Sequence, residues 1–254
     1  MITVVAGPAG CGKTTWICEQ LRHVASGDKV IYFSPGTGKV PIDQIRLKAE
    51  FPEIQVICDG EEAQFLSQVA DAENIYIELG FYLELSSIEQ ILGNVPYHAV
   101  AILPPSWENP EYQVWAEKVV TGLDIHTNIT ENQIWRSPTT GQVIDEDSLN
   151  EFWYELSHCA YGEVSRAKGI FDVADGRALY ADFVAGVANA DFLELDLPRH
   201  LEGRPQRFSG LEVWGKHLDE PAIKETLQDC YLSDAAIAQY QTQVKQILIE
   251  ESIQ

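Results

Sequence analysis

Short apolar runs and segments with helical spacing alternate along the first part of the chain. The apolar runs, each short enough for a buried strand, are Ile2–Ala6, Lys29–Phe33, Ile54–Ile57, Ile75–Ile77, His98–Leu103 and Ile134–Arg136. The helical segments are Trp16–Ala25, Ile42–Ala49, Glu61–Ala70, Tyr112–Val120 and Asp145–His158. Strands that alternate with helices imply right-handed crossovers and a parallel sheet with its ligand at the carboxyl ends of the strands. We therefore expect an α/β domain with a mostly parallel sheet flanked by helices over residues 1–159.

The pattern changes near residue 160. Four short strand-like runs follow, at Arg166–Val173, Ala178–Val184, Phe192–Leu197 and Gly210–Trp214, and the turn residues between them favour an antiparallel sheet. Pro221 is well placed to begin a helix that runs to about Tyr231. Ser233 is the predicted cap of a last helix with an apolar stripe. The sequence thus predicts a second, smaller α+β domain over residues 160–254.

A glycine-rich segment joins the first predicted strand to the first helix. It reads Gly7-Pro8-Ala9-Gly10-Cys11-Gly12-Lys13-Thr14-Thr15 and satisfies the pattern G-x-x-x-x-G-K-[ST] between a strand and a helix. Backbone N–H groups of such a loop, together with the positive end of the helix, cradle a polyphosphate. We expect Gly7, Gly10, Cys11, Gly12, Lys13, Thr14 and Thr15 to bind a nucleotide, with Lys13 on the β and γ phosphates and Thr14 on Mg²⁺. The alternative is a strand-to-helix turn without a ligand.

Glu78 directly follows the predicted strand Ile75–Ile77. A carboxylate at the carboxyl end of a strand beside a phosphate loop can hold Mg²⁺ or orient a catalytic water. We therefore name Glu78 with Lys13 as the candidate catalytic residues, and Glu78 with Thr14 as the candidate Mg²⁺ ligands; a solvated glutamate is the alternative. Thr37, in the loop after the second strand, either reaches the same ion or belongs to an ordinary Pro-Gly turn.

The charge of the chain restricts its partners and location. Thirty-nine acidic and 17 basic residues give a net charge of −22, which repels nucleic acid and anionic lipid. No run approaches the roughly 18 apolar residues of a membrane helix. A strand that begins at residue 2 leaves no room for a signal peptide, so we expect a cytoplasmic protein. Five scattered cysteines without a C-x-x-C pair indicate neither a disulfide framework nor a zinc ribbon.

With these segments in view, the chain resembles the CobW family of P-loop GTPases, which is related to the GTPases that load nickel into urease and hydrogenase. The resemblance rests on the phosphate loop and on two stretches of the second domain, Arg166–Ile170 and Leu211–Asp219. It implies a P-loop domain followed by a CobW C-terminal domain. It further implies binding of GTP and GDP with Mg²⁺, and a conformational switch that a client protein reads.

Two family motifs differ in this chain. The C-x-C-C metal motif is replaced by Ile57-Cys58-Asp59-Gly60, and one thiol cannot make a closed tetrahedral site, so zinc and metal transfer are not expected. The guanine motif [NT]-K-x-D corresponds to Thr121-Gly122-Leu123-Asp124. The resemblance implies that Asp124 accepts hydrogen bonds from guanine, whereas Gly122 lacks the lysine stem that packs over the base.

Three functions remain open on the sequence alone. The first is a slow Mg²⁺-dependent GTPase that acts as a switch for a client protein. The second is a non-catalytic interaction or assembly factor with a degenerate nucleotide site, and the third, less favoured, is a metallochaperone. Arg199, His200, Arg204 and Arg207 form a basic patch that either docks an acidic partner or balances neighbouring carboxylates. The last helix packs on its own domain or contacts a client or a second copy of the chain.

Overall fold

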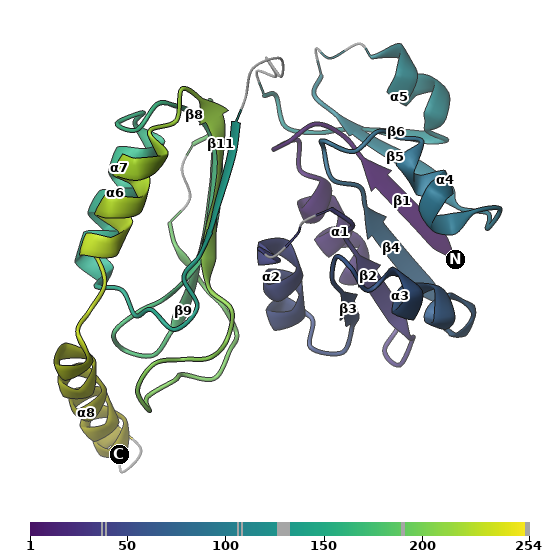
Figure 1. Ribbon diagram of the computed structural model, residues 1–254. Coiled ribbons are helices and arrows are strands. Elements are labelled where there is room, and N and C mark those ends of the chain that lie inside the picture. Colours follow the sequence, from purple (N-terminus) through teal and green to yellow (C-terminus); the bar gives the residue numbers. More distant parts are fainter. Residues whose placement is uncertain are drawn as a thin grey trace. The chain divides into compact units, whose positions relative to one another are not determined.

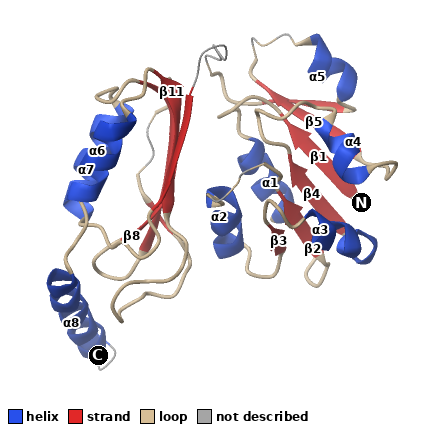
Figure 2. Cartoon of the chain, in the orientation of Figure 1, coloured by secondary structure: helices blue, strands red, loops and turns tan. Residues whose placement is uncertain are grey.

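The computed structural model describes residues 1–36, 38, 40–105, 107, 109–125, 133–188 and 191–251. The chain divides into two compact units, Met1–Thr127 and Asn128–Gln254. Figure 1 follows the chain through both units, and Figure 2 separates the helices of each from its strands.

The first unit contains a six-stranded parallel sheet in the order β3-β2-β4-β1-β5-β6. Its strands are β1 (Ile2–Ala6), β2 (Val30–Phe33), β3 (Gln55–Ile57), β4 (Asn74–Glu78), β5 (His98–Leu103) and β6 (Lys118–Thr121). The helices are α1 (Lys13–Leu21), α2 (Ile42–Glu50), α3 (Glu62–Gln68), the 3-10 turn η1 (Val69–Asp71), α4 (Ser87–Leu92) and α5 (Pro110–Trp115). Phe33 of β2 stacks on Phe65 of α3, with ring centroids 4.7 Å apart in the core. The predicted α/β fold with a mostly parallel sheet is confirmed.

The end of this unit differs from the sequence prediction. Residues up to Val120 were expected to be helical, but α5 ends at Trp115 and Lys118–Thr121 form an edge strand parallel to β5. Two consecutive β-branched residues, Val119 and Val120, favour the extended conformation once a strand is available for pairing. The short helix α4 was not predicted.

The second unit contains a five-stranded antiparallel sheet in the order β10-β9-β8-β11-β7. Its strands are β7 (Gln133–Pro138), β8 (Glu163–Asp172), β9 (Ala178–Val184), β10 (Leu193–Glu194) and β11 (Gly210–Lys216). Helices α6 (Glu146–Ser157) and α7 (Glu220–Asp229) lie along the sheet in Figure 1 and share one buried cluster with it. Phe152 and Leu156 of α6 pack there with Ile223 of α7 and Phe171 of β8.

Two elements expected in the first domain lie in the second unit. β7 pairs antiparallel with β11, with Arg136 opposite Glu212, and α6 covers that same sheet. The division of the chain therefore comes at Thr127–Asn128, earlier than the boundary placed near residue 160. A strand followed by a helix has the same local pattern in either sheet, and the partner of β7 lies far along the sequence.

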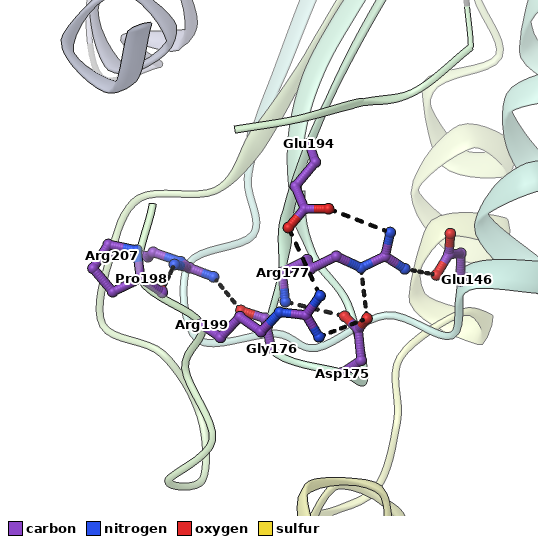
Figure 3. A network of polar contacts seen from close by, with 8 residues as sticks. All are labelled: Glu146, Asp175, Gly176, Arg177, Glu194, Pro198, Arg199 and Arg207. Carbon is purple, nitrogen blue, oxygen red and sulfur yellow. Dashed lines mark hydrogen bonds and ion pairs between the residues drawn. The ribbon is translucent and has the colours of Figure 1, made fainter. Parts of the chain in front are cut away.

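The arginines of the predicted basic patch are engaged by carboxylates and carbonyl oxygens of the second unit. Figure 3 shows Arg199 beside Asp175 and Glu194, in a network that also contains Arg177. Arg207 contacts the buried Asp172 at 2.6 Å and donates to the carbonyl oxygens of Pro198 and Gly176. Arg204 contacts Asp234 at 2.7 Å. These contacts favour charge balance over a free basic surface.

The first turns of the last helix, α8 (Asp234–Glu251), pack on the second unit. Ile237 and Gln241 are buried, and the Gln241 amide exchanges two hydrogen bonds with the backbone of Gly203, each of 2.8 Å. Ile247 and Leu248, farther along, are exposed. Among the described residues, no helix combines the length and the apolar character needed to cross a bilayer.

Candidate functional site

The phosphate loop connects β1 to α1 at the carboxyl end of the parallel sheet. Gly12 precedes α1 with φ of 99°, a left-handed conformation that favours glycine. Within the described residues no side chain caps α1, and its first turn carries no acidic residue. Helices α6 and α7, in contrast, are capped by Asp145 and Asp219. The first N–H groups of α1 have no acceptor within the helix, so this terminus is suited to an anion.

Lys13 lies over the phosphate loop. Its Nζ donates to the carbonyl oxygens of Gly7 and Pro8, at 3.0 and 3.1 Å, and the residue is 5% exposed. Among the ion pairs of the described residues, none involves Lys13. The ammonium group is thus held by neutral acceptors, which a phosphate can replace.

Thr14 and Glu78 meet at the start of α1. The register of the sheet places Glu78 of β4 opposite Val5 of β1, two residues before the loop. Thr14 Oγ1 donates to Glu78 Oε1 at 3.0 Å, and both residues are buried. The two candidate Mg²⁺ ligands are therefore in direct contact.

Tyr32 is a further member of this group that the sequence analysis missed. It lies in β2, is fully buried, and its hydroxyl donates to Glu78 Oε2 at 2.9 Å. Burial, followed by the nearby Glu78 and Asp43 carboxylates, raises the pKa of Tyr32 well above its usual value, so the phenol stays a donor. A tyrosine in an otherwise apolar buried strand needs a partner for its hydroxyl, and that requirement was the available signal.

The loop after β2 is fastened to its neighbours. Ser34 Oγ donates to the backbone oxygen of Glu78 at 3.2 Å. The N–H groups of Gly36 and Gly38 donate to the two carboxylate oxygens of Asp59, at 2.8 and 3.0 Å. Thr37, the candidate Mg²⁺ ligand that the sequence analysis placed in this loop, lies outside the described residues.

Cys58 precedes this carboxylate in the connection between β3 and α3. Burial raises the pKa of the Cys58 thiol, and the Glu61 and Asp59 carboxylates raise it further. A protonated thiol is a poor metal ligand. The surroundings of Cys58 thus disfavour the thiolate.

The segment of the predicted guanine motif packs directly on the phosphate loop. The Leu123 N–H donates to the Cys11 carbonyl oxygen at 3.1 Å, and the Gly122 N–H donates to Leu103 O at 2.7 Å. A Cβ atom on Gly122 would lie 2.3 Å from Cys11 O, so no side chain fits without movement of the backbone. Asp124 is exposed and follows directly after this contact.

A pocket of about 280 Å³ lies between the phosphate loop and this segment. Cys11, Gly12, Thr15, Trp16, Glu19, Ile102, Val120, Thr121, Gly122 and Leu123 line it. The sequence prediction placed Gly7 to Thr15 in one loop and Glu78 beside it, and the structure brings these residues together. Asp124 is not among the residues that line the pocket.

The donors at Thr14 and Glu78 fit Mg²⁺. Both offer hard oxygen atoms, and Mg²⁺ is usually held by one or two carboxylates together with phosphates and waters. The described residues contain no group of three or more His, Cys, Asp or Glu side chains arranged for a metal ion. The donor set therefore suits a Mg²⁺ ion that arrives with a polyphosphate.

Comparison with known proteins adds the following. Residues 137–231 match the family described as the cobalamin synthesis protein cobW C-terminal domain. This match confirms the family resemblance carried by the second half of the sequence. Similar solved structures are the zinc-bound YjiA GTPase from E. coli and a zinc-bound triple mutant of YjiA. Each is 14% identical, covers 90% of this chain and 98% of its own, and has a TM-score of 0.33. No curated protein sequence matches the chain.

Proposed function

We propose that this chain, whose residues 137–231 match the cobW C-terminal domain family, binds guanine nucleotides with Mg²⁺ and hydrolyses GTP slowly. The proposal rests on one observation. Lys13, Thr14 and Glu78 lie together at an uncapped helix N-terminus that follows a buried strand. P-loop hydrolysis depends on positioning and electrostatics, and this group contains the parts that such chemistry needs.

Each residue of the group has a role in the proposed binding. Lys13 exchanges its carbonyl acceptors, Gly7 O and Pro8 O, for phosphate oxygens. The N–H groups of the loop and of the first turn of α1 donate to the remaining phosphate oxygens. Asp124, by the family resemblance, accepts hydrogen bonds from the base.

Thr14 and Glu78 would hold the Mg²⁺ ion, and Tyr32 keeps the Glu78 carboxylate in place through its hydroxyl. Bound there, the ion would neutralise negative charge on the phosphate oxygens. Glu78, which contacts Thr14 directly, would also orient an attacking water. The sheet fixes its backbone, so this orientation costs little at the moment of reaction.

The remaining parts of the proposal come from the family resemblance. They are a client protein that reads the bound nucleotide and a location in the cytoplasm. Metal transfer does not belong to the proposal, because Cys58 is a single thiol whose surroundings disfavour the thiolate.

Calorimetric titration of GTP and GDP in the presence of Mg²⁺ tests the binding. We expect Lys13→Ala to weaken GTP binding by at least about tenfold, since a hydrogen bond to a charged group is lost. Lys48→Ala is the matched control, because Lys48 also donates to two backbone carbonyl oxygens, those of Pro52 and Ile54. We expect that variant to bind GTP as the wild type does.

Release of inorganic phosphate from GTP tests the turnover. Glu78→Gln keeps the size of the side chain but removes its charge, and we expect it to lower the rate. Binding of GTP by the wild type without phosphate release would favour the interaction factor with a degenerate nucleotide site. Absence of binding by either GTP or GDP would contradict the proposed function.

A further inference from the structure

The 280 Å³ pocket beside the phosphate loop is placed for the base of a nucleotide. It shares Cys11, Gly12 and Thr15 with the residues predicted to hold the phosphates. A group tethered to a bound polyphosphate therefore reaches it. Its volume is just below the range of about 300–1,000 Å³ found for whole small-molecule sites, so it suits one part of a nucleotide.

The pocket lacks the lysine that covers the base in the family's guanine motif. Gly122 occupies that position, and its backbone lies so close to Cys11 O that a Cβ atom would approach to 2.3 Å. The same Cβ would lie 2.9 Å from Cγ2 of Ile102. A base in this pocket must accordingly find its packing surface elsewhere.

Trp16 supplies a flat aromatic surface in the same pocket. It lies two residues after Thr14 in α1, is half-buried, and lines the pocket together with Glu19 one turn later. Lys118 Nζ lies over the indole, 6.0 Å from the ring centroid, a distance at which a cation is attracted to a tryptophan face. This contact places the ammonium group of Lys118, in β6, beside the ring.

Within the lining of the pocket, the charged residue favours a base over a phosphate. Glu19 is the acidic residue in its lining, and the other lining residues are apolar, hydroxyl-bearing or glycine. A carboxylate repels phosphate oxygens and accepts from the amino group of a base. The phosphates are therefore directed to the loop and the base to the pocket.

We propose that Trp16 is the surface on which the nucleotide base stacks, in place of the lysine stem that Gly122 excludes. The inference rests on the proposed nucleotide binding and adds to it a residue that binds the base by stacking. Stacking on an aromatic side chain contributes about 1–3 kcal/mol per base, which corresponds to about tenfold to hundredfold in affinity.

Titration of GTP and of inorganic tripolyphosphate into three variants tests this role. We expect Trp16→Leu to weaken GTP binding by about tenfold to hundredfold and to leave tripolyphosphate binding unchanged, because only GTP carries a base. Trp16→Phe keeps an aromatic ring and should retain most of the affinity for GTP. Trp107→Leu is the matched control, since Trp107 belongs to the same unit but does not line the pocket.

Tryptophan fluorescence provides a measurement that does not require Trp16→Leu to fold. GTP should quench the emission of the wild type while tripolyphosphate does not, and the quenching should disappear in Trp16→Phe. Persistence of the quenching in that variant would refute the role of Trp16, as would wild-type affinity of Trp16→Leu for GTP. An equal loss of GTP and tripolyphosphate binding in Trp16→Leu would refute it too.

The two proposals fail differently. Wild-type protein that binds tripolyphosphate and GTP equally well would overturn the base-stacking role while the phosphate site stands. Wild-type protein that binds neither would overturn both.

Discussion

Replacement of Gly122 by alanine tests how closely the segment after β6 packs on the phosphate loop. The added Cβ would meet Cys11 O at 2.3 Å, and backbone atoms cannot rotate away as a side chain can. Overpacking of this kind costs about 1–3 kcal/mol. The displaced segment also weakens the 3.1 Å hydrogen bond from Leu123 N–H to Cys11 O, and such a bond contributes about 0.5–1.5 kcal/mol net.

One term opposes this loss. Alanine restricts the unfolded chain and thereby stabilises the folded state by about 0.4–1 kcal/mol. The net expectation for Gly122→Ala is a decrease of about 1–3 kcal/mol in the free energy of unfolding. Gly122→Lys restores the lysine of the guanine motif but carries the same Cβ atom. This variant should therefore be destabilised without a gain in GTP affinity.

Urea denaturation combined with hydrogen exchange measures the effect. We expect a lower unfolding midpoint for Gly122→Ala and faster exchange of the Leu123 amide proton. Gly80→Ala is the control, because its Cβ would meet the Tyr82 side chain at 3.2 Å and Pro35 O at 3.4 Å, distances that small adjustments relieve. Unchanged stability of Gly122→Ala, with a protected Leu123 amide, would refute the reasoning.

Two further predictions concern buried groups of the same unit. Tyr32→Phe removes the hydrogen bond to Glu78 and should lower the free energy of unfolding by about 1.5–3 kcal/mol in urea titrations; wild-type stability would contradict the assigned contact. Burial, and next the Glu50 carboxylate, raises the pKa of Cys18 from 9.0 to about 12. The folded thiol thus keeps a proton that the unfolded thiol loses, so its contribution to stability is present below pH 9 and is lost as the pH rises towards 12. Between these pH values, the free energy of unfolding of Cys18→Ala should fall less steeply with rising pH than that of the wild type. Equal slopes would show that Cys18 does not cause this pH dependence.

The sequence predicted the phosphate loop and the strands around it because local signals determine both. The run Ile2–Ala6 has the length and apolar character of a buried strand, and it is one. Glu78 could be placed beside the loop because parallel strands end at a common edge of the sheet. Contact between Thr14 and Glu78 follows from that topology.

Other features depend on tertiary pairing and could not be read locally. β7 has the pattern of any short strand, and its partner β11 follows only after three further strands. β6 was predicted as the end of a helix because Val119 and Val120 lie next to a helical stretch, and pairing with β5 makes them extended. The pocket at Trp16 depends on the approach of Gly122 to Cys11, which no pattern in the sequence reports.

The carboxylate of Asp59 couples two connections that are separate in sequence. Its oxygens accept from the amides of Gly36 and Gly38, and α3 begins three residues later at Glu62. Any displacement of the loop after β2 must either release both amides or pull Asp59 along with it. In the second case the first turn of α3 moves as well, so movement of this loop would be transmitted to a helix that lies in a different connection of the chain.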